Sequence, residues 1–159
     1  MYKHILVAVG SDSDFNTLKS AINLSRDCGA RLTALHVVDT VPHLTLMADL
    51  DISAALSAFE THGRSMIEQC NRAFEEAACD GEAQMWTAPL CSATIGRVIA
   101  NAASELGADL IMLGSSSPSW LRFYAPNVQK DVTRYSAVPV LVMTPSCTMP
   151  TKPAAFAAA

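Results

Sequence analysis

The chain has 159 residues, which suits one domain with one buried core and leaves too little sequence for a second. Apolar residues make up 50% of it and charged residues 16%, a balance typical of a globular protein, so we expect residues 1–144 to be ordered. The formal net charge of −4 offers no long-range attraction to phosphate backbones or anionic lipid, which makes nucleic acid an unexpected partner.

The N-terminus and the cysteines bear on location and cross-links. No apolar run reaches the roughly 18 residues that span a bilayer, and Met1–His4 leads directly into a predicted strand rather than a signal peptide. We therefore expect a cytoplasmic protein with no membrane partner. The five cysteines form no CxxC pair, which argues against disulfides and zinc. Cys70, Cys79 and Cys91 are predicted to be small buried side chains, and Cys147 an exposed thiol.

The first part of the chain predicts a parallel strand, helix and strand unit. Ile5–Val9 is a short apolar run that closes at Gly10, as expected for a strand buried on both faces. From Asp14, apolar residues recur at helical spacing as far as Cys28, where a glycine follows. The run Arg31–Val38 predicts the second strand, and the unit should be right-handed.

The middle of the chain continues this alternation. Residues 51–79 predict a long helix, with a break expected near Gly63. Residues 82–87 mix polar and apolar side chains and predict a strand near the sheet edge. Residues 94–106 predict another helix, and residues 109–114 predict a fully buried fourth strand.

The C-terminal part predicts a loop, a short helix and a last strand. Residues 115–126 are rich in serine and proline, and a short helix follows at about Val128. Val138–Met143 predicts the fifth strand, and its Pro139 requires an edge position or pairing that begins after that residue. The tail, residues 145–159, has no periodic apolar face and is expected to be flexible.

Polar and small residues follow three of the predicted strands. A parallel sheet binds ligands at the carboxyl ends of its strands, where strand order reverses. The expected ends are Gly10-Ser11-Asp12, Val38-Asp39 and Gly114–Ser117. Glycine followed by three serines lets a phosphate approach the backbone and adds hydroxyl donors, and a helix that begins near Asn127 adds N–H groups. The alternative is a flexible loop solvated by its own hydroxyls.

Four segments resemble the universal stress protein family, in its order and spacing over residues 2–143. They are Tyr2–Val9, Ala34–Val38, Leu106–Gly114 and Ala137–Val142. The resemblance implies a single doubly wound five-stranded parallel sheet of order 3-2-1-4-5, Rossmann-like and of the adenine nucleotide alpha hydrolase type. It also implies a homodimer through the last strand, Val138–Met143, and a cytoplasmic role in the stress response. In one branch of the family, the loop after strand four holds ATP or AMP.

Several positions depart from the pattern of the ATP-binding branch. That branch carries Asp directly after strand one, where this chain has Gly10 and its nearest carboxylate is Asp12. Ser117 stands at the loop's second glycine, and Pro126-Asn127 fall on the third glycine and its partner because the loop is one residue shorter. Proline offers no N–H to a phosphate, and serine adopts positive φ less readily than glycine. Asn127 remains able to cap the final helix.

Two interpretations of these departures stay open. In the first, the phosphate-binding loop is lost and ATP is not held tightly. In the second, serine hydroxyls replace the missing backbone donors and hold a different or weaker anion. The candidate nucleotide-contacting residues at matching positions are Gly10, Ser11, Val38, Gly114, Ser115, Ser117, Asn127 and Val128.

No residue pattern indicates a catalytic centre or a metal site. The four histidines show no metal-ligand spacing, and structural roles are favoured for His4 and His36. Asp12 and Asp14 are interpreted as helix-capping residues rather than an acid and base pair. The cluster Trp120–Tyr124 is predicted to cover the sheet end, or alternatively to close over a small apolar ligand or meet a partner.

Three hypotheses of function follow. The first is a dimeric, non-enzymatic stress-response regulator with a degenerate nucleotide site and no required cofactor. The second is a sensor or weak ATPase that binds ATP or AMP in the strand-four loop. The third is a binder of a small apolar ligand.

Overall fold

Five parallel strands form one sheet with the order β3-β2-β1-β4-β5. The computed structural model describes residues 1–10, 14–38, 52–89, 94–115 and 127–144. The helices and strands, in chain order, are β1 (His4–Ala8), α1 (Phe15–Cys28), β2 (Arg31–Val38), α3 (Ile52–Glu76), β3 (Gly81–Thr87), α4 (Ile95–Leu106), β4 (Leu110–Gly114), α5 (Val128–Tyr135) and β5 (Val140–Met143). The predicted strand order and α/β class are confirmed.

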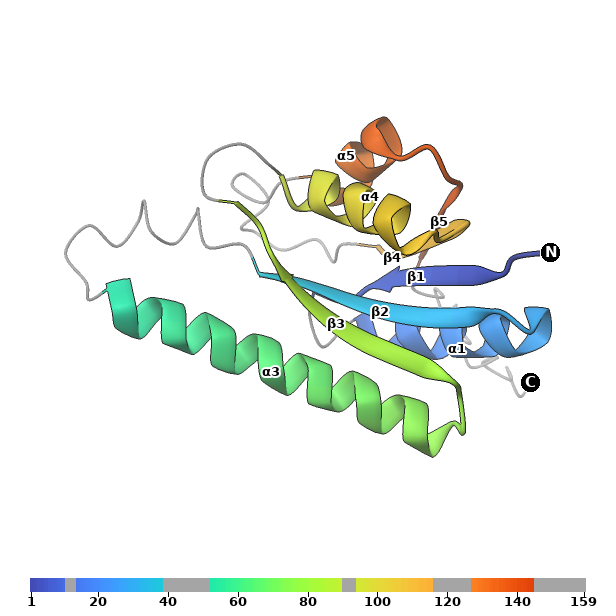
Figure 1. Cartoon of the computed structure of the whole chain (residues 1–159), viewed down its shortest axis with the longest axis horizontal. Coiled ribbons are helices and arrows are strands. Elements are labelled where there is room, and N and C mark those ends of the chain that lie inside the picture. The colour runs from blue at the N-terminus through green and yellow to red at the C-terminus, as the bar shows by residue number, and fades with distance from the viewer. Residues whose placement is uncertain (11–13, 39–51, 90–93, 116–126, 145–159) are drawn as a thin grey trace, which may run out of the picture.

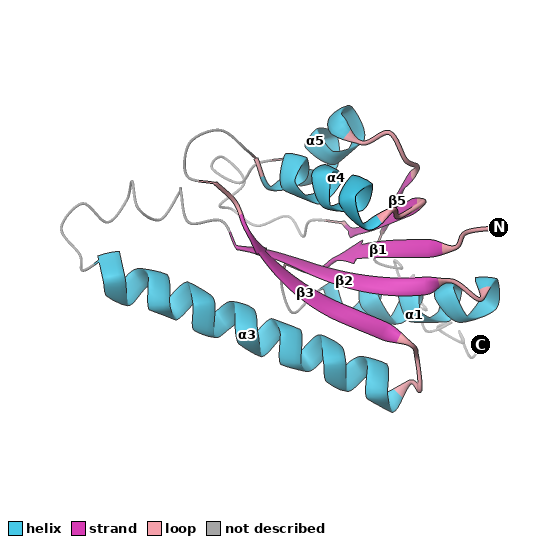
Figure 2. Cartoon of the chain, in the orientation of Figure 1, coloured by secondary structure: helices cyan, strands magenta, loops and turns pink. Residues whose placement is uncertain are grey.

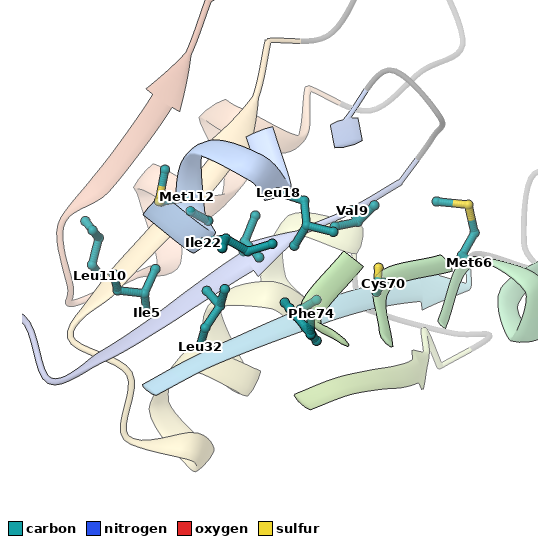
Figure 3. Packing of buried hydrophobic residues seen from close by; sticks show 13 residues of the cluster. Ile5, Val9, Leu18, Ile22, Leu32, Met66, Cys70, Phe74, Leu110 and Met112 are labelled. Carbon is teal, nitrogen blue, oxygen red and sulfur yellow. The ribbon is translucent and has the colours of Figure 1, made fainter. Parts of the chain in front are cut away.

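Helices cover both faces of the sheet (Figure 1), with α1 and α3 on one face and α4 and α5 on the other. Side chains of a strand alternate between faces, so Ile5, Val7 and Val9 meet α1 and α3 whereas Leu6 meets α4 and α5. Figure 3 shows the first of these layers, in which Leu18 of α1 packs near Val9. Both faces of the central strands are therefore buried, which explains their continuous apolar runs.

Two helices end where the sequence predicts, because glycine adopts the left-handed conformation there. Gly29 follows α1 with φ +61°, and Gly107 follows α4 with φ +67°. Each N–H returns to carbonyl groups of the last helical turn, which satisfies acceptors that the helix leaves open. These tight ends deliver the chain into β2 and β4 within a few residues.

The long helix α3 is continuous through Gly63, so the predicted break is wrong (Figure 2). Glycine weakens a helix interior by only about 1 kcal/mol, which tertiary packing readily offsets. A Cβ added at Gly63 would overlap the sulfur of Met85 and lie 3.3 Å from Cγ2 of Val38. The glycine therefore marks a close approach of α3 to the sheet rather than a break.

The last strand lies at one edge of the sheet, opposite β3 at the other edge. It begins at Val140, after Pro139, whose carbonyl oxygen accepts a hydrogen bond from the N–H of Ile111 at 3.0 Å. The strand thus lies at an edge and begins after Pro139, as the proline predicts. The edge position expected for β3 is also confirmed.

Several other predictions concern buried and terminal residues. Cys70 is buried and Cys79 half-buried. Cys91, Cys147 and the tail lie outside the described residues, as does the cluster Trp120–Tyr124. Among the helices in the described ranges, none has the length and apolar character needed to cross a membrane.

Candidate functional site

The carboxyl ends of β1 and β4 lie next to each other. Parallel pairing sets Ala8 opposite Leu113, so Gly10 and Gly114 follow at adjacent strand ends. The strand order reverses here, because β1 leads to β2 on one side while β4 lies on the other. Open parallel sheets bind ligands at such a reversal. The expected proximity of the two glycines is present, and ligand binding there stays a prediction.

The carboxylate of Asp14 lies between these two strand ends. Its Oδ2 accepts a hydrogen bond from the N–H of Gly10 at 2.9 Å. Its Oδ1 lies so near Gly114 that a Cβ added to the glycine would overlap it, and that Cβ would also lie 3.1 Å from Oγ1 of Thr17. Gly114 is therefore a close-approach glycine, and negative charge lies at the tip of the sheet.

Asp14 stands at the predicted capping position, but its side chain does not cap the helix. The residue occupies the N-cap position of α1 but has helical φ and ψ, and its side chain makes no capping hydrogen bond. The carboxylate instead turns back to the backbone four residues earlier, at Gly10. Asp12 lies outside the described residues. Nothing in the spacing of the acidic residues distinguishes a cap from this backward contact.

The start of α5 closes another side of the site. Oδ1 of Asn127 accepts a hydrogen bond from the N–H of Lys130 at 3.1 Å, so the predicted cap is confirmed. Val128 is half-buried and packs against the α4 and α5 core cluster. Nε2 of Gln129 donates to the carbonyl oxygen of Gly114 at 3.0 Å. This contact, which the sequence did not indicate, ties the first turn of α5 to the end of β4.

The remaining candidate residues are distributed around this edge. Val38 is buried at the end of β2, and its carbonyl oxygen accepts from the N–H of Ala88 at 2.9 Å. Ser115 is half-buried, and its N–H donates to the carbonyl oxygen of Met143 at 2.7 Å. Ser11 and Ser117 lie outside the described residues. The backbone donor of Ser115 is thus already engaged within the sheet.

Two histidine rings are held by hydrogen bonds. Nδ1 of His4 donates to the carbonyl oxygen of Leu106 at 3.0 Å, and Nε2 lies 2.8 Å from Oγ1 of Thr33. Nδ1 of His36 donates to the carbonyl oxygen of Val9 at 2.8 Å. Burial lowers the pKa of His36 below its ordinary value of 6.5, and nearby His62 lowers it further, although the Val9 bond acts in the other direction.

Other groups with possible chemistry are limited in the described part of the chain. Burial raises the pKa of the Cys70 thiol to about 11, so this thiol stays protonated and unreactive at neutral pH. Within the described ranges, no three His, Cys, Asp or Glu side chains gather as a metal site would require. The strand ends around Asp14 therefore stand out as the candidate site, with backbone groups, a carboxylate and an amide.

The fold and the strand-end site define an α/β protein of the doubly wound, Rossmann-like class. The sequence profile of the universal stress protein family matches residues 1–144, and the chain belongs to this family. A universal stress protein of Methanocaldococcus jannaschii is 26% identical over 149 residues, which are 90% of this chain and 82% of that protein. A universal stress protein A homologue of Haemophilus ducreyi is 27% identical over 131 residues, 81% of this chain and 88% of the homologue.

Solved structures show the same fold. A universal stress protein family member from Burkholderia pseudomallei superimposes with a TM-score of 0.72 at 25% identity, covering 89% of this chain and 96% of that one. A universal stress protein from Lactobacillus plantarum gives a TM-score of 0.69 at 24% identity, covering 89% of this chain and 97% of the other.

Proposed function

We propose that this protein is a dimeric, non-enzymatic regulator of the cytoplasmic stress response whose strand-end site binds adenine nucleotides weakly and disfavours ATP. The observation that carries the proposal is the carboxylate of Asp14 between Gly10 and Gly114. It lies at the edge where a parallel sheet of this class would receive a phosphate.

Asp14 acts on a phosphate group in two ways. Its charge repels an anion, by about 1 kcal/mol at 4 Å in water and about 4 kcal/mol at an effective dielectric of 20. Its Oδ2 also occupies the N–H of Gly10, which is then withheld from a phosphate oxygen. The repulsion grows with the number of negative charges on the ligand, whereas the lost N–H is a fixed cost, so ATP should lose more affinity than AMP.

Related structures support a ligand with few phosphates. A universal stress protein of 20% identity is described in complex with cAMP. One from Archaeoglobus fulgidus, of 21% identity, is described in complex with dAMP, and one from Arabidopsis thaliana, of 15% identity, with AMP bound. At these identities the likeness concerns the fold, and it supports nucleoside monophosphates as the first ligands to test here.

The test compares Asp14→Asn with the wild type in calorimetric titrations with AMP, cAMP and ATP. Asparagine keeps an oxygen that accepts from Gly10 and removes the charge. We expect wild-type affinity to fall from AMP to ATP, and the variant to gain about tenfold for ATP, which corresponds to about 1.4 kcal/mol. The gain should shrink at high salt, because screening weakens the repulsion it removes.

Asp27→Asn is the matched control, since Asp27 is an exposed carboxylate near the other end of α1. It should leave all affinities unchanged. Micromolar ATP binding by the wild type would overturn the degenerate site in favour of a nucleotide sensor. ATP hydrolysis by the wild type faster than in a reaction without protein would overturn the non-enzymatic role. If Asp14→Asn and Asp27→Asn changed the affinity for ATP equally, Asp14 would not be the cause of the weak ATP binding.

The apolar-ligand hypothesis depends on Trp120–Tyr124, which lies outside the described residues. It stays a prediction, tested by a change in Trp120 fluorescence on adding an apolar ligand but not on adding nucleotide. The cytoplasmic location is tested by fractionating cells that produce the protein.

A further inference from the structure

Two imidazoles and a thioether from three different elements meet where α3 crosses β2 and β3. His36 and Met85 are register partners on the neighbouring strands β2 and β3, so their side chains share a face of the sheet. His62 and Gly63 lie on the helix that covers this face. None of these three side chains is a candidate nucleotide-contacting residue, although His36 bonds Val9, which precedes Gly10, and Val38 lies nearby.

The ring of His36 is fixed with one nitrogen toward the helix. Nδ1 donates to the carbonyl oxygen of Val9 at 2.8 Å. Cδ2 would lie 3.4 Å from a Cβ at Gly63, so the edge that carries Cδ2 and Nε2 faces α3. Histidines that bind metals commonly donate their other N–H to a backbone carbonyl, which fixes the tautomer and leaves a lone pair on Nε2. His36 has this arrangement.

The second imidazole lies at a suitable separation. The ring centroids of His36 and His62 are 6.0 Å apart, with an angle of 74° between the ring planes. Metal–nitrogen bonds of about 2.0–2.1 Å place the centroids of two rings that share an ion roughly 5 to 6.5 Å apart. His62 is exposed whereas His36 is buried, so an ion could enter from solvent on the His62 side.

The thioether of Met85 comes close to the ring of His36 because α3 has no side chain at Gly63. Its sulfur and Cδ2 of His36 both lie within contact range of the Cβ position that Gly63 leaves vacant. A glycine inside a helix costs about 1 kcal/mol, so its presence here indicates that the space is used. Val38 also lies beside it and adds no charge.

We propose that His36, His62 and Met85 form a binding site for a single Cu(I) ion. A thioether is a soft donor that selects Cu(I), and imidazole is a donor that also suits copper. Zinc generally takes four ligands and favours thiolates, imidazoles and carboxylates. Within the described residues no such further ligand joins the pair of histidines, consistent with the lack of a three-residue His, Cys, Asp and Glu cluster.

The test is an anaerobic competition for Cu(I) between the full chain and the chelator bicinchoninate, with accessible thiols blocked by iodoacetamide in every arm. The wild type should take up one equivalent. Met85→Leu conserves volume and His62→Ala alters an exposed residue, so both should remain folded. Each should weaken Cu(I) binding about tenfold or more, since each removes one ligand.

Controls and a site-specific readout make the result decisive. Met143→Leu on β5 and Arg64→Ala on α3 should leave affinity within about twofold of the wild type. With methionine methyl groups labelled with ¹³C, the resonance missing from Met85→Leu should be the one that shifts on adding Cu(I) to the wild type. Failure of the wild type to compete, or equal affinity of Met85→Leu and Met143→Leu, would overturn the site. Neither result bears on nucleotide binding.

Discussion

At the scale of single residues, Asp109 links the starts of β4 and β1. Its Oδ2 accepts from the N–H of Lys3 at 2.8 Å and its Oδ1 from the N–H of His4 at 3.1 Å. The hydrogen bond from Lys3 is the main reason why the pKa of Asp109 lies below its ordinary value of 3.8. The contact spans more than a hundred residues of sequence, so the carboxylate links the N-terminal residues to the start of β4.

We expect Asp109→Asn to lower the free energy of unfolding by about 1 kcal/mol at pH 7, because it removes a charged acceptor near solvent. The folded-state pKa is depressed, so this contribution is present above the ordinary value of 3.8 and is lost as pH falls through the lower folded value. Urea unfolding at pH 7, 5 and 3 should show the difference from wild type shrinking only at the lowest pH. A difference that stays constant to pH 3 would contradict this account.

At the scale of elements, α4 and α5 pack closely because α4 carries Gly96 at their contact. A Cβ there would lie 2.9 Å from the carbonyl oxygen of Val128 and 2.9 Å from the amide nitrogen of Val132. These are backbone atoms, which cannot move aside as a flexible side chain would. The first turn of α5, which also bonds Gly114 through Gln129, is therefore positioned by α4.

The sign of the stability change in Gly96→Ala tests this packing. In an exposed helix the change would stabilise by up to about 1 kcal/mol, whereas overpacking against α5 should destabilise by about 1–3 kcal/mol. We expect a lower melting temperature than wild type, measured by circular dichroism. Ser104→Ala, at an exposed position of α4, is the control and should be neutral or slightly stabilising. A more stable Gly96→Ala protein would contradict the close contact.

The elements themselves could be predicted from the sequence because their signals are local. Apolar runs, helical spacing and glycine ends located the strands and helices, and Pro139 indicated where β5 begins. The helix break expected at Gly63 was wrong because the glycine is there for tertiary packing. It makes room for Met85, which no local pattern pairs with it.

The candidate site was predictable only in outline. Strand ends follow from strand order, so Gly10 and Gly114 were expected to be neighbours. The rotamer of Asp14 and the contact of Gln129 depend on side-chain geometry between elements. His36, His62 and Met85 come from three separate segments, and their sequence spacing matches no metal-binding pattern.

At the scale of the whole molecule, β5 leaves an apolar edge. Four consecutive apolar residues form this strand, and its only partner among the described strands is β4. Leu141 is 41% exposed. Unprotected edge strands readily pair with another chain, which supports the homodimer of the proposed function.

Leu141→Lys should convert the dimer to a monomer, because a lysine on an edge strand opposes pairing with a second chain. Light scattering should give twice the 16.9 kDa of one chain for the wild type and a single chain for the variant. Leu56→Lys is the control, since Leu56 is 37% exposed on α3. A wild-type protein that is monomeric at micromolar concentration would exclude the dimer.

The order of the helices along the chain bears on how the sheet folds during synthesis. The strands β1, β2 and β3 and the helices α1 and α3 precede α4 and α5 in the chain, so only one face of the nascent sheet can be covered until α4 and α5 leave the ribosome. Leu6, Leu35 and Trp86 face the side that later elements shield. We expect nascent chains whose α4 and α5 have not yet left the ribosome to be captured by chaperones, and release to follow once the second pair of helices emerges.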